Sequence, residues 1–322
     1  MIRNIAVVAG GDSSEWQVSF RSAEGLLSFL DNDRYDVRIV SLRGQQWEVV
    51  DGSRRHPIDK NDFSYQVDGK RHTFDYAYIT IHGTPGENGL LQGYFDLIRM
   101  PYSSCSALVS ALTFDKYVCK QYLRGFGINV APCILLRNGQ TVDASRVQAE
   151  LGFPCFVKST TGGSSFGVSK VKTAGQLPEA IRLAYEQGSE VMIEAFMDGT
   201  EITCGCYKTH SKSVVFPVTE VVSESEFFDY DAKYNGRVSE ITPARISTML
   251  TERVQQLTSR IYDLLGCHGI VRIDYIITNG DCINLLEINT TPGMTATSFI
   301  PQQVRAAGLD IKDVLTDIIE NR

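Results

Sequence analysis

The first third of the chain alternates short apolar runs with an amphipathic stretch. Runs at 5–10, 35–42 and 76–83 have the length and β-branched content of buried strands, and residues 13–30 show helical spacing. Strands separated by helical segments favour a parallel sheet with helices on its faces. We therefore predict a doubly wound α/β domain over residues 1–115.

Two further regions follow, and both mix helices with strands. The expected helices and strands of the middle region are 115–127, 153–160, 168–172, 177–188 and 191–197. Those of the last region are the strands 201–208 and 213–222, the helix 249–266, a hairpin over 271–289 and a final helix. These patterns predict two α+β domains, 116–196 and 197–322. Residues 223–244 are polar and aromatic without periodicity, and such long loops are often lids.

The hairpin places polar side chains inside apolar strands. Asn279-Gly280 is a preferred pair for a two-residue turn, and a turn centred there sets Arg272 opposite Glu287. Asp274 then lies diagonal to Glu287, with Leu285 as its direct partner. Because strand side chains alternate between faces, Arg272, Asp274, Glu287 and Asn289 are all expected on one face.

Two interpretations of this polar face remain open on spacing alone. Two carboxylates about 4 Å apart repel by about 4 kcal/mol at an effective dielectric near 20, and a cation would relieve that repulsion. Oxygen ligands without histidine or cysteine suit Mg²⁺, with Mn²⁺ as the alternative metal. Arg272 could instead neutralise Glu287 in a structural ion pair.

Other candidate residues each have an ordinary structural interpretation as well. The loop 161–167 is rich in glycine and serine, so its N–H groups could cradle a phosphate beside Lys158, or it could be a plain hairpin. Glu15 begins a helix and could either stabilise the helix dipole or bind a ligand at the end of a strand. The remaining candidates are more often solvated or structural residues than ligands: Lys116, His82, Glu194 and Glu201.

Composition narrows the class of protein. The net charge of -7 and the lack of a dominant basic stretch argue against a nucleic-acid partner. Eight scattered cysteines without a Cys-x-x-Cys pair argue against a zinc site and, with no signal-peptide pattern, favour the cytoplasm. No run reaches the ~20 apolar residues of a membrane helix, so no membrane association is expected.

The order of the motifs resembles that of the D-alanine–D-alanine ligases of the ATP-grasp superfamily over essentially the whole chain. The matching segments, in order, are "GGDSSEWQVS", "IHGTPGENGLLQGYF", "DKYVCKQYL", "FPCFVKSTTGGSSFGVSKV", "VMIEAFMDGTEIT", "FFDYDAKY", "VRIDYI" and "LLEINTTPGMTATS". The resemblance implies a three-domain ATP-grasp architecture whose second and third domains enclose ATP. It also strongly favours the metal interpretation of the hairpin.

The resemblance implies an ATP-dependent ligase that joins two D-alanines for peptidoglycan synthesis. One D-alanine carboxylate would attack the γ-phosphate, and the amine of the second would then attack the acyl phosphate. By motif match, Lys116 and Lys158 would contact the phosphates, Glu194 the adenine amino group and Glu201 the ribose. Asp274, Glu287 and Asn289 would hold two Mg²⁺.

The resemblance also assigns the substrate side. Arg272 and the Gly293 backbone would stabilise the tetrahedral intermediate. Glu15, with His82 nearby, would hold the first D-alanine, while Ser298 and Lys233 would bind the second carboxylate and the transferring phosphate. Glu15, Ser164 and Tyr234 would form a hydrogen-bonded triad that closes the loop and the lid against water.

Some positions depart from the common family pattern, and some alternatives stay open. The departures are Trp16, Ser159, Gly162, Ala195 and Phe299. Tyr234 in the lid motif favours an amine nucleophile, although D-serine or D-lactate remain possible acceptors. A regulator that binds ATP without turnover is the alternative outside the enzymes. A homodimer is expected from the family alone.

Overall fold

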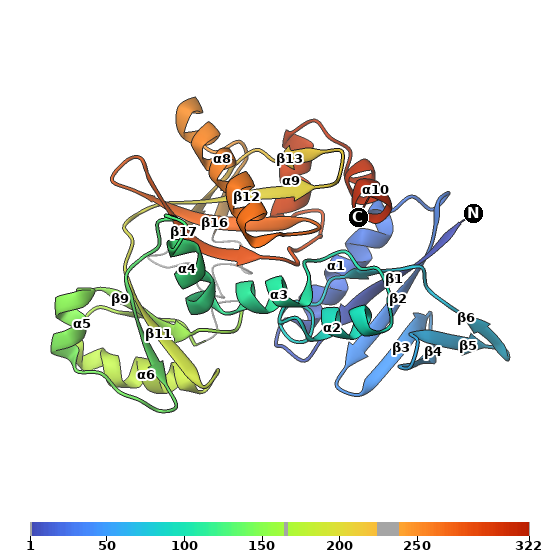
Figure 1. Cartoon of the computed structure of the whole chain (residues 1–322), viewed down its shortest axis with the longest axis horizontal. Helices are drawn as coiled ribbons and strands as arrows, with labels where there is room; N and C mark the ends of the chain where they lie inside the picture. The colour runs from blue at the N-terminus through green and yellow to red at the C-terminus, as the bar shows by residue number, and fades with distance from the viewer. Residues whose placement is uncertain (1, 164–166, 224–237, 322) are drawn as a thin grey trace.

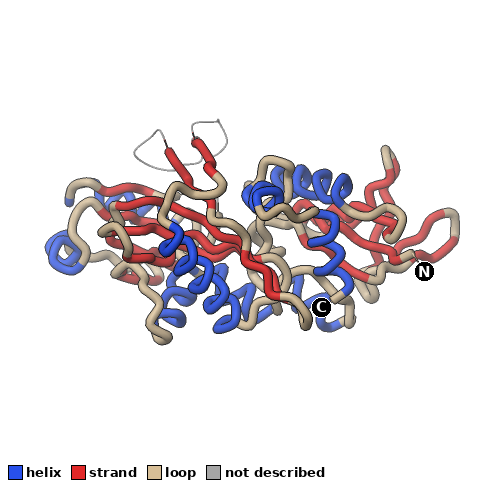
Figure 2. Tube along the Cα trace, turned by 90° about the horizontal axis from the view of Figure 1, so that it is seen from above, coloured by secondary structure: helices blue, strands red, loops and turns tan. Residues whose placement is uncertain are grey.

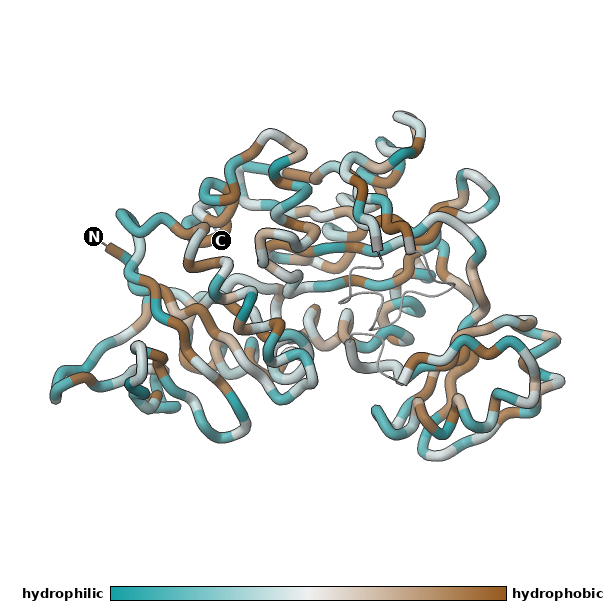
Figure 3. Tube along the Cα trace, turned by 180° about the vertical axis from the view of Figure 1, so that it is seen from behind, coloured by the Kyte–Doolittle hydropathy of each residue, from teal (hydrophilic) through white to brown (hydrophobic). Residues whose placement is uncertain are grey.

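The computed structural model describes residues 2–163, 167–223 and 238–321 and contains three β-sheets (Figure 1). A seven-stranded sheet contains the N-terminal region, a four-stranded sheet the middle region, and a six-stranded sheet most of the last region. Hydrophobic residues are frequent along the strands, while many of the outer loops are hydrophilic (Figure 3). The predicted mixed α/β class is confirmed.

The seven-stranded sheet has a parallel centre and an antiparallel extension. Its strand order is β6-β5-β4-β3-β2-β1-β7; the pairs β1–β2 and β1–β7 are parallel, whereas the pairs from β2 to β6 are antiparallel. The strands are β1 (Arg3–Gly10), β2 (Tyr35–Arg43), β3 (Gln46–Asp51), β4 (Arg54–Asp59), β5 (Ser64–Val67), β6 (Lys70–His72) and β7 (Tyr76–Ile79). The sequence prediction found the parallel centre but missed β3–β6, which are short and, apart from β5, contain charged residues.

Helices cover both faces of the parallel centre. Helix α1 (Trp16–Phe29) packs on the face of Ile5 and Val7, together with α10 (Ile311–Glu320) from the end of the chain. Helix α2 (Leu90–Leu97) packs on the opposite face, with Ala6 and Val8. The carboxyl end of β1 and the loop after β7 therefore open at one edge of the sheet, where ligands bind in such folds.

The middle sheet is antiparallel in the order β10-β9-β11-β8. Its elements are β8 (Cys133–Arg137), α5 (Ala144–Glu150), β9 (Cys155–Ser159), β10 (Ser169–Val171), α6 (Leu177–Tyr185) and β11 (Glu190–Ala195). One face packs against α6 through Ala180, Ile181 and Ala184. The other face carries Lys158 and Glu194 and turns toward the rest of the chain.

The third sheet follows the order β15-β14-β12-β16-β17, with β13 paired to β12. Its elements are β12 (Gly199–Lys208), β13 (Ser213–Val215), β14 (Thr219–Ser223), β15 (Val238–Ile241), α8 (Thr248–Leu265), β16 (Val271–Thr278), β17 (Cys282–Asn289) and α9 (Phe299–Ala306). Figure 2 shows helices on both sides of the strand layers. Helix α8 covers the apolar face of the third sheet, whose core includes Ile273 and Tyr275.

Two helices connect the first sheet with the other two. Helix α3 (Ala107–Phe114) begins at Ser106, whose hydroxyl accepts from the Val109 N–H, and α4 (Lys116–Arg124) begins at Asp115, whose carboxylate accepts from the Val118 N–H. Cys119 and Leu123 of α4 belong to the core of the six-stranded sheet. Helix α4 thus lies between the middle and third sheets (Figure 1).

In the described part of the chain, no helix is both long and apolar enough to cross a bilayer.

The β16–β17 hairpin differs from the predicted register. Thr278 pairs with Cys282 across a three-residue turn, and Tyr275 pairs with Leu285. A β-bulge then shifts the register, so Asp274 lies directly opposite Glu287 rather than diagonal to it. Arg272 lies opposite Asn289, not Glu287. The predicted register was wrong, yet all four polar residues share one face because the bulge restores the alternation.

Candidate active site

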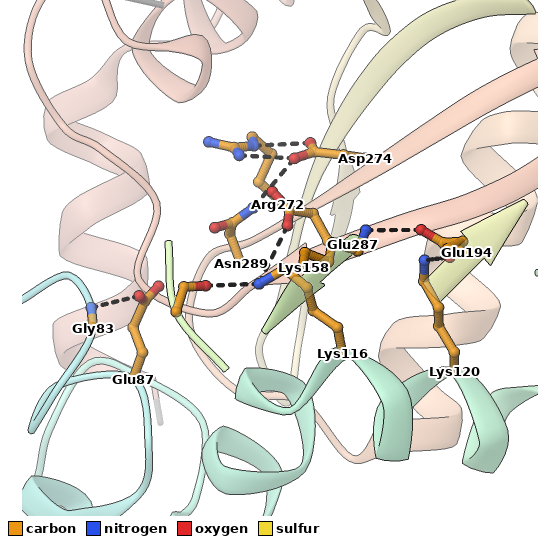
Figure 4. A network of polar contacts seen from close by, with 11 residues as sticks. Gly83, Glu87, Lys116, Lys120, Lys158, Glu194, Arg272, Asp274, Glu287 and Asn289 are labelled. Carbon is orange, nitrogen blue, oxygen red and sulfur yellow. Dashed lines mark hydrogen bonds and ion pairs between the residues drawn. The ribbon is translucent and has the colours of Figure 1, made fainter. Parts of the chain in front are cut away.

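The polar face of the hairpin is organised around the carboxylate of Asp274. Arg272 donates to both of its oxygens, from Nε at 2.9 Å and from Nη2 at 2.8 Å (Figure 4). The Thr203 hydroxyl from β12 adds a bond of 2.5 Å, and Asn289 Nδ2 adds one of 3.2 Å. Burial alone would lower the pKa of Arg272, but Asp274 outweighs it and the pKa is raised. The guanidinium is therefore a permanent cation in the site.

Glu287 and Lys116 link this face to the glycine-rich loop. Lys116 Nζ lies 3.7 Å from Glu287 Oε2 and donates to the Gly162 carbonyl at 2.7 Å. Its backbone N–H donates to the Thr160 carbonyl at 2.8 Å, which fixes the start of α4 against the strand before the loop. A cation from α4 thus connects a loop of the middle sheet with a carboxylate of the third sheet.

The two-bond partner of Arg272 is Asp274, and the negative charge of Glu287 adds to the raised pKa of Arg272. The residues still fit a hard divalent cation. Two carboxylates and an amide come from adjacent strands on one face, and carboxylate and amide oxygens are the ligands that Mg²⁺ accepts. Asp274 would exchange one of its four hydrogen bonds for the metal. Glu287, with a side chain 35% exposed, is the carboxylate that faces the open space.

A second charged cluster lies on the middle sheet. Glu194 of β11 is buried and accepts from Lys158 Nζ of β9 at 2.7 Å through Oε2. Its other oxygen accepts from Lys120 of α4, which is also buried (Figure 4). Burial alone would raise the pKa of Glu194, but the two lysines outweigh it and hold the pKa at about 2. Burial lowers the pKa of Lys120, and the charge of Glu194 opposes that lowering.

The N-terminal sheet contributes two more carboxylates. Glu15 is the N-cap residue of α1, and a Cβ built on Gly163 would come within 2.4 Å of its Oε2. The glycine-rich loop therefore lies close to Glu15, and a side chain at position 163 would displace the Glu15 carboxylate. Glu87 follows β7 and accepts from the Gly83 N–H at 2.7 Å. Burial, the largest cause, and the charge of Glu15 raise the pKa of Glu87 to about 7, while Gly83, Thr291 and Lys116 act to lower it.

The turn after β17 completes the site. Ser298 is the N-cap residue of α9, and its Oγ accepts from the Thr295 N–H at 3.1 Å. Gly293 lies against it, since a Cβ there would be 3.0 Å from Ser298 Oγ. The Arg272 guanidinium lies over the ring of Phe299, 5.1 Å from its centroid, in a cation–π contact. Phe299, one of the departures from the family pattern, therefore contributes to the position of Arg272.

These groups surround a cavity of about 440 Å³, within the range of small-molecule sites. Eight of the site residues predicted from the sequence line it: Glu15, His82, Lys116, Arg272, Glu287, Asn289, Gly293 and Ser298. Gly162 and Gly163 of the loop line it as well. Asp274, Lys158 and Glu194 are buried and do not belong to its lining. Glu201 lies on β12 opposite Ile276, on the same sheet face as Asp274 by strand alternation. Ser164, Lys233 and Tyr234 lie outside the described residues.

Sequence reasoning missed Glu87 and Lys120. Glu87 stands in the segment "IHGTPGENG", in which His82 was the predicted site residue. Lys120 follows Lys116 by four residues, and such a pair shares a helix face. That spacing was the available signal, but nothing in the sequence placed a carboxylate opposite the second lysine.

Comparison with known proteins supports a single family. The family described as D-ala D-ala ligase N-terminus matches residues 4–105, and D-ala D-ala ligase C-terminus matches residues 122–320. A protein of Bacteroides fragilis named D-alanine–D-alanine ligase is 65% identical, and one of Phocaeicola vulgatus with the same name is 66% identical. Each alignment covers 100% of this chain and of the relative.

Solved structures agree with the sequence relatives. The VanG D-Ala:D-Ser ligase from Enterococcus faecalis superposes with a TM-score of 0.88 at 30% identity, covering 99% of both chains. The D-alanyl-alanine synthetase A from Vibrio cholerae gives 0.89 at 26% identity, covering 99% of this chain and 97% of the other. Because the family match, the relatives and the fold coincide over nearly the full length, this chain belongs to the D-alanine–D-alanine ligase family.

Proposed function

We propose that this protein joins two D-alanines into D-alanyl-D-alanine, with conversion of ATP to ADP and phosphate, as a step toward peptidoglycan. The observation that carries the proposal is the cavity that Glu15, Arg272 and Glu287 share. It combines an anion for a substrate ammonium, a permanent cation for a developing oxyanion, and carboxylates for a metal that binds phosphates. An acyl-phosphate route requires all three.

The phosphate side follows from the charges. Lys116 lies between the glycine-rich loop and Glu287, so it would contact the β- and γ-phosphates together with Lys158. Asp274, Glu287 and Asn289 would hold Mg²⁺, which when bound would neutralise the triphosphate and the transferring group. Glu194 would accept from the adenine amino group and Glu201 from the ribose. The boundaries 1–115, 116–196 and 197–322 are proposed for the domains that enclose these sites.

The substrate side follows from the cavity lining. Glu15 would hold the ammonium of the first D-alanine, with His82 beside it. Arg272 and the Gly293 N–H would stabilise the oxyanion of the tetrahedral intermediate, and Ser298 would bind the carboxylate of the second D-alanine. The contact of Gly163 with Glu15 supports closure of the loop onto this subsite. The proposed roles of Ser164, Lys233 and Tyr234 rest on the motif match alone.

The direct test is turnover with purified protein. Release of ADP and phosphate should require both D-alanine and Mg²⁺, and mass spectrometry should detect the dipeptide. Arg272→Met should abolish product while ATP still binds, because it removes the permanent cation. ATP binding with no phosphate release under any D-amino acid would instead support a regulator without turnover.

A second acceptor has a specific observation in its favour. One of the structural neighbours is a D-Ala:D-Ser ligase at 30% identity, so D-serine is the alternative second substrate. Competition between D-alanine, D-serine and D-lactate, followed by product mass, separates the candidates. D-Alanyl-D-serine as the main product would replace our proposal.

We also propose that the protein is a homodimer and that it acts in the cytoplasm, where ATP is available. Sedimentation would test the dimer.

A further inference from the structure

Glu194 binds two lysines that differ in burial and in the element that carries them. Lys120 is 1% exposed and projects from α4, whereas Lys158 is 9% exposed and lies on β9 just before the glycine-rich loop. Figure 4 shows the two ammonium groups reaching the carboxylate from different elements. Lys158 therefore lies nearer to solvent and to the phosphate side.

This arrangement gives Lys158 two anionic acceptors that compete for its ammonium group. The proposed function requires its ammonium group at the phosphates, whereas in the structure it donates to Glu194 at 2.7 Å. If Lys158 were the sole partner of Glu194, its departure would leave a buried carboxylate unpaired. Breaking a buried ion pair in that way is strongly unfavourable.

We propose that Lys120 stays bound to Glu194, so that Lys158 can exchange between Glu194 and the nucleotide phosphates. The proposal rests on the proposed function, because it assumes that Lys158 contacts phosphate. Lys120 acts through Lys158 and Glu194, which makes it a positioning residue.

The surroundings of Lys120 fit a fixed partner. Helix α4 is anchored by the bond from the Lys116 N–H to Thr160 and by packing of Cys119 and Leu123 in the core of the third sheet. The Lys120 side chain therefore has little freedom to leave Glu194. A carboxylate has about four acceptor positions, so Glu194 can keep Lys120 and still accept from an adenine amino group.

The test compares ligands with and without phosphates. In Lys120→Met, Lys158 becomes the remaining lysine partner of Glu194 and is retained there. The dissociation constant for ATP, measured by calorimetry, should rise about 10- to 100-fold, the loss expected for one charge-assisted contact. The dissociation constant for adenosine should stay within about 3-fold of that of the unmodified protein, because Glu194 remains ionised. Lys120→Arg should bind both ligands nearly as the unmodified protein does.

Further variants keep the test decisive. Lys120→Met combined with Glu194→Gln should recover ATP affinity relative to Lys120→Met alone, because a neutral amide at position 194 releases Lys158. If Lys120→Met fails to fold, Lys120→Gln carries the same expectation with a polar side chain. Lys212→Met, which removes a surface lysine paired with Asp317, is the matched control and should change neither constant.

If Lys120→Met weakened the binding of ATP and of adenosine equally, Lys120 would have only a structural role, and the proposal would be overturned. Unchanged ATP affinity in Lys120→Met would overturn it as well. Failure of the proposed function gives a different result. In that case Lys158→Met would leave ATP affinity of the otherwise unmodified protein intact.

Discussion

Glu87 should make the stability of this protein depend on pH in a direction opposite to that of most acidic residues. Its pKa is about 7 in the folded protein against an ordinary value of 4.5, because burial and Glu15 disfavour the charged form. The folded state therefore binds the proton more tightly than the unfolded state. The stabilisation linked to this proton is complete below pH 4.5 and is lost as the pH rises through about 7.

The magnitude follows from the two pKa values. The interval from 4.5 to about 7 corresponds to at most about 3 kcal/mol at 1.36 kcal/mol per pH unit. Glu87→Gln keeps the size of the neutral acid and removes the ionisation. We therefore expect Glu87→Gln to exceed the free energy of unfolding of the unmodified protein by less than about 1 kcal/mol at pH 5 and by about 3 kcal/mol at pH 8.

Urea unfolding at pH 5, 6, 7 and 8 measures the difference, and taking the difference cancels the other titrating groups. The chain has two tryptophans, Trp16 and Trp47, and both lie in the N-terminal region with Glu87, so fluorescence reports on the relevant part. Glu24→Gln, at an exposed position of α1, is the control. If the difference in the free energy of unfolding were the same at every pH, or grew toward acidic pH, the raised pKa of Glu87 could not be its cause.

Three further variants test the site. Glu287→Gln should raise the Mg²⁺ concentration for half-maximal turnover by about 10-fold with the fold intact, because it removes one charged ligand; an unchanged Mg²⁺ titration would contradict the metal face. Arg272→Lys should lower kcat about 100-fold with little change in the KM for ATP, since lysine cannot make both bonds to Asp274; a loss confined to KM would exclude the oxyanion role. Gly163→Ala should raise the KM for D-alanine about 10-fold, because its methyl group would displace the Glu15 carboxylate. Equal increases in the KM for ATP and for D-alanine would indicate a general distortion of the loop instead.

The register of the hairpin shows where sequence reasoning succeeded and where it failed. Strand alternation placed Arg272, Asp274, Glu287 and Asn289 on one face, which the structure confirms. The Asn279-Gly280 pair suggested a two-residue turn, but the turn has three residues and a bulge follows. The sequence did carry a sign of this, because the buried residues Ile283, Leu285 and Ile288 break the two-residue period between 285 and 288.

Contacts between distant segments were harder to predict. Motif order brought Glu15 together with Arg272, but no local pattern shows that Lys120 meets Glu194, 74 residues away, or that Glu87 is half-buried beside Glu15. These contacts depend on how three sheets pack around α3 and α4. The antiparallel strands β3–β6 were missed because their exposed, charged faces lack the apolar runs that identify buried strands.

The irregularity at Leu286 has a consequence for anyone who redesigns this hairpin. On a perfectly regular ribbon with the same turn, Leu286 and Ile288 would line the reaction chamber, and Glu287 and Asn289 would be driven into the apolar interior. If Asp274, Glu287 and Asn289 were transferred to another hairpin without the additional residue Leu286, Glu287 and Asn289 would therefore point to the opposite face of the sheet from Asp274. A deletion of one leucine should accordingly be more harmful than most point substitutions around it.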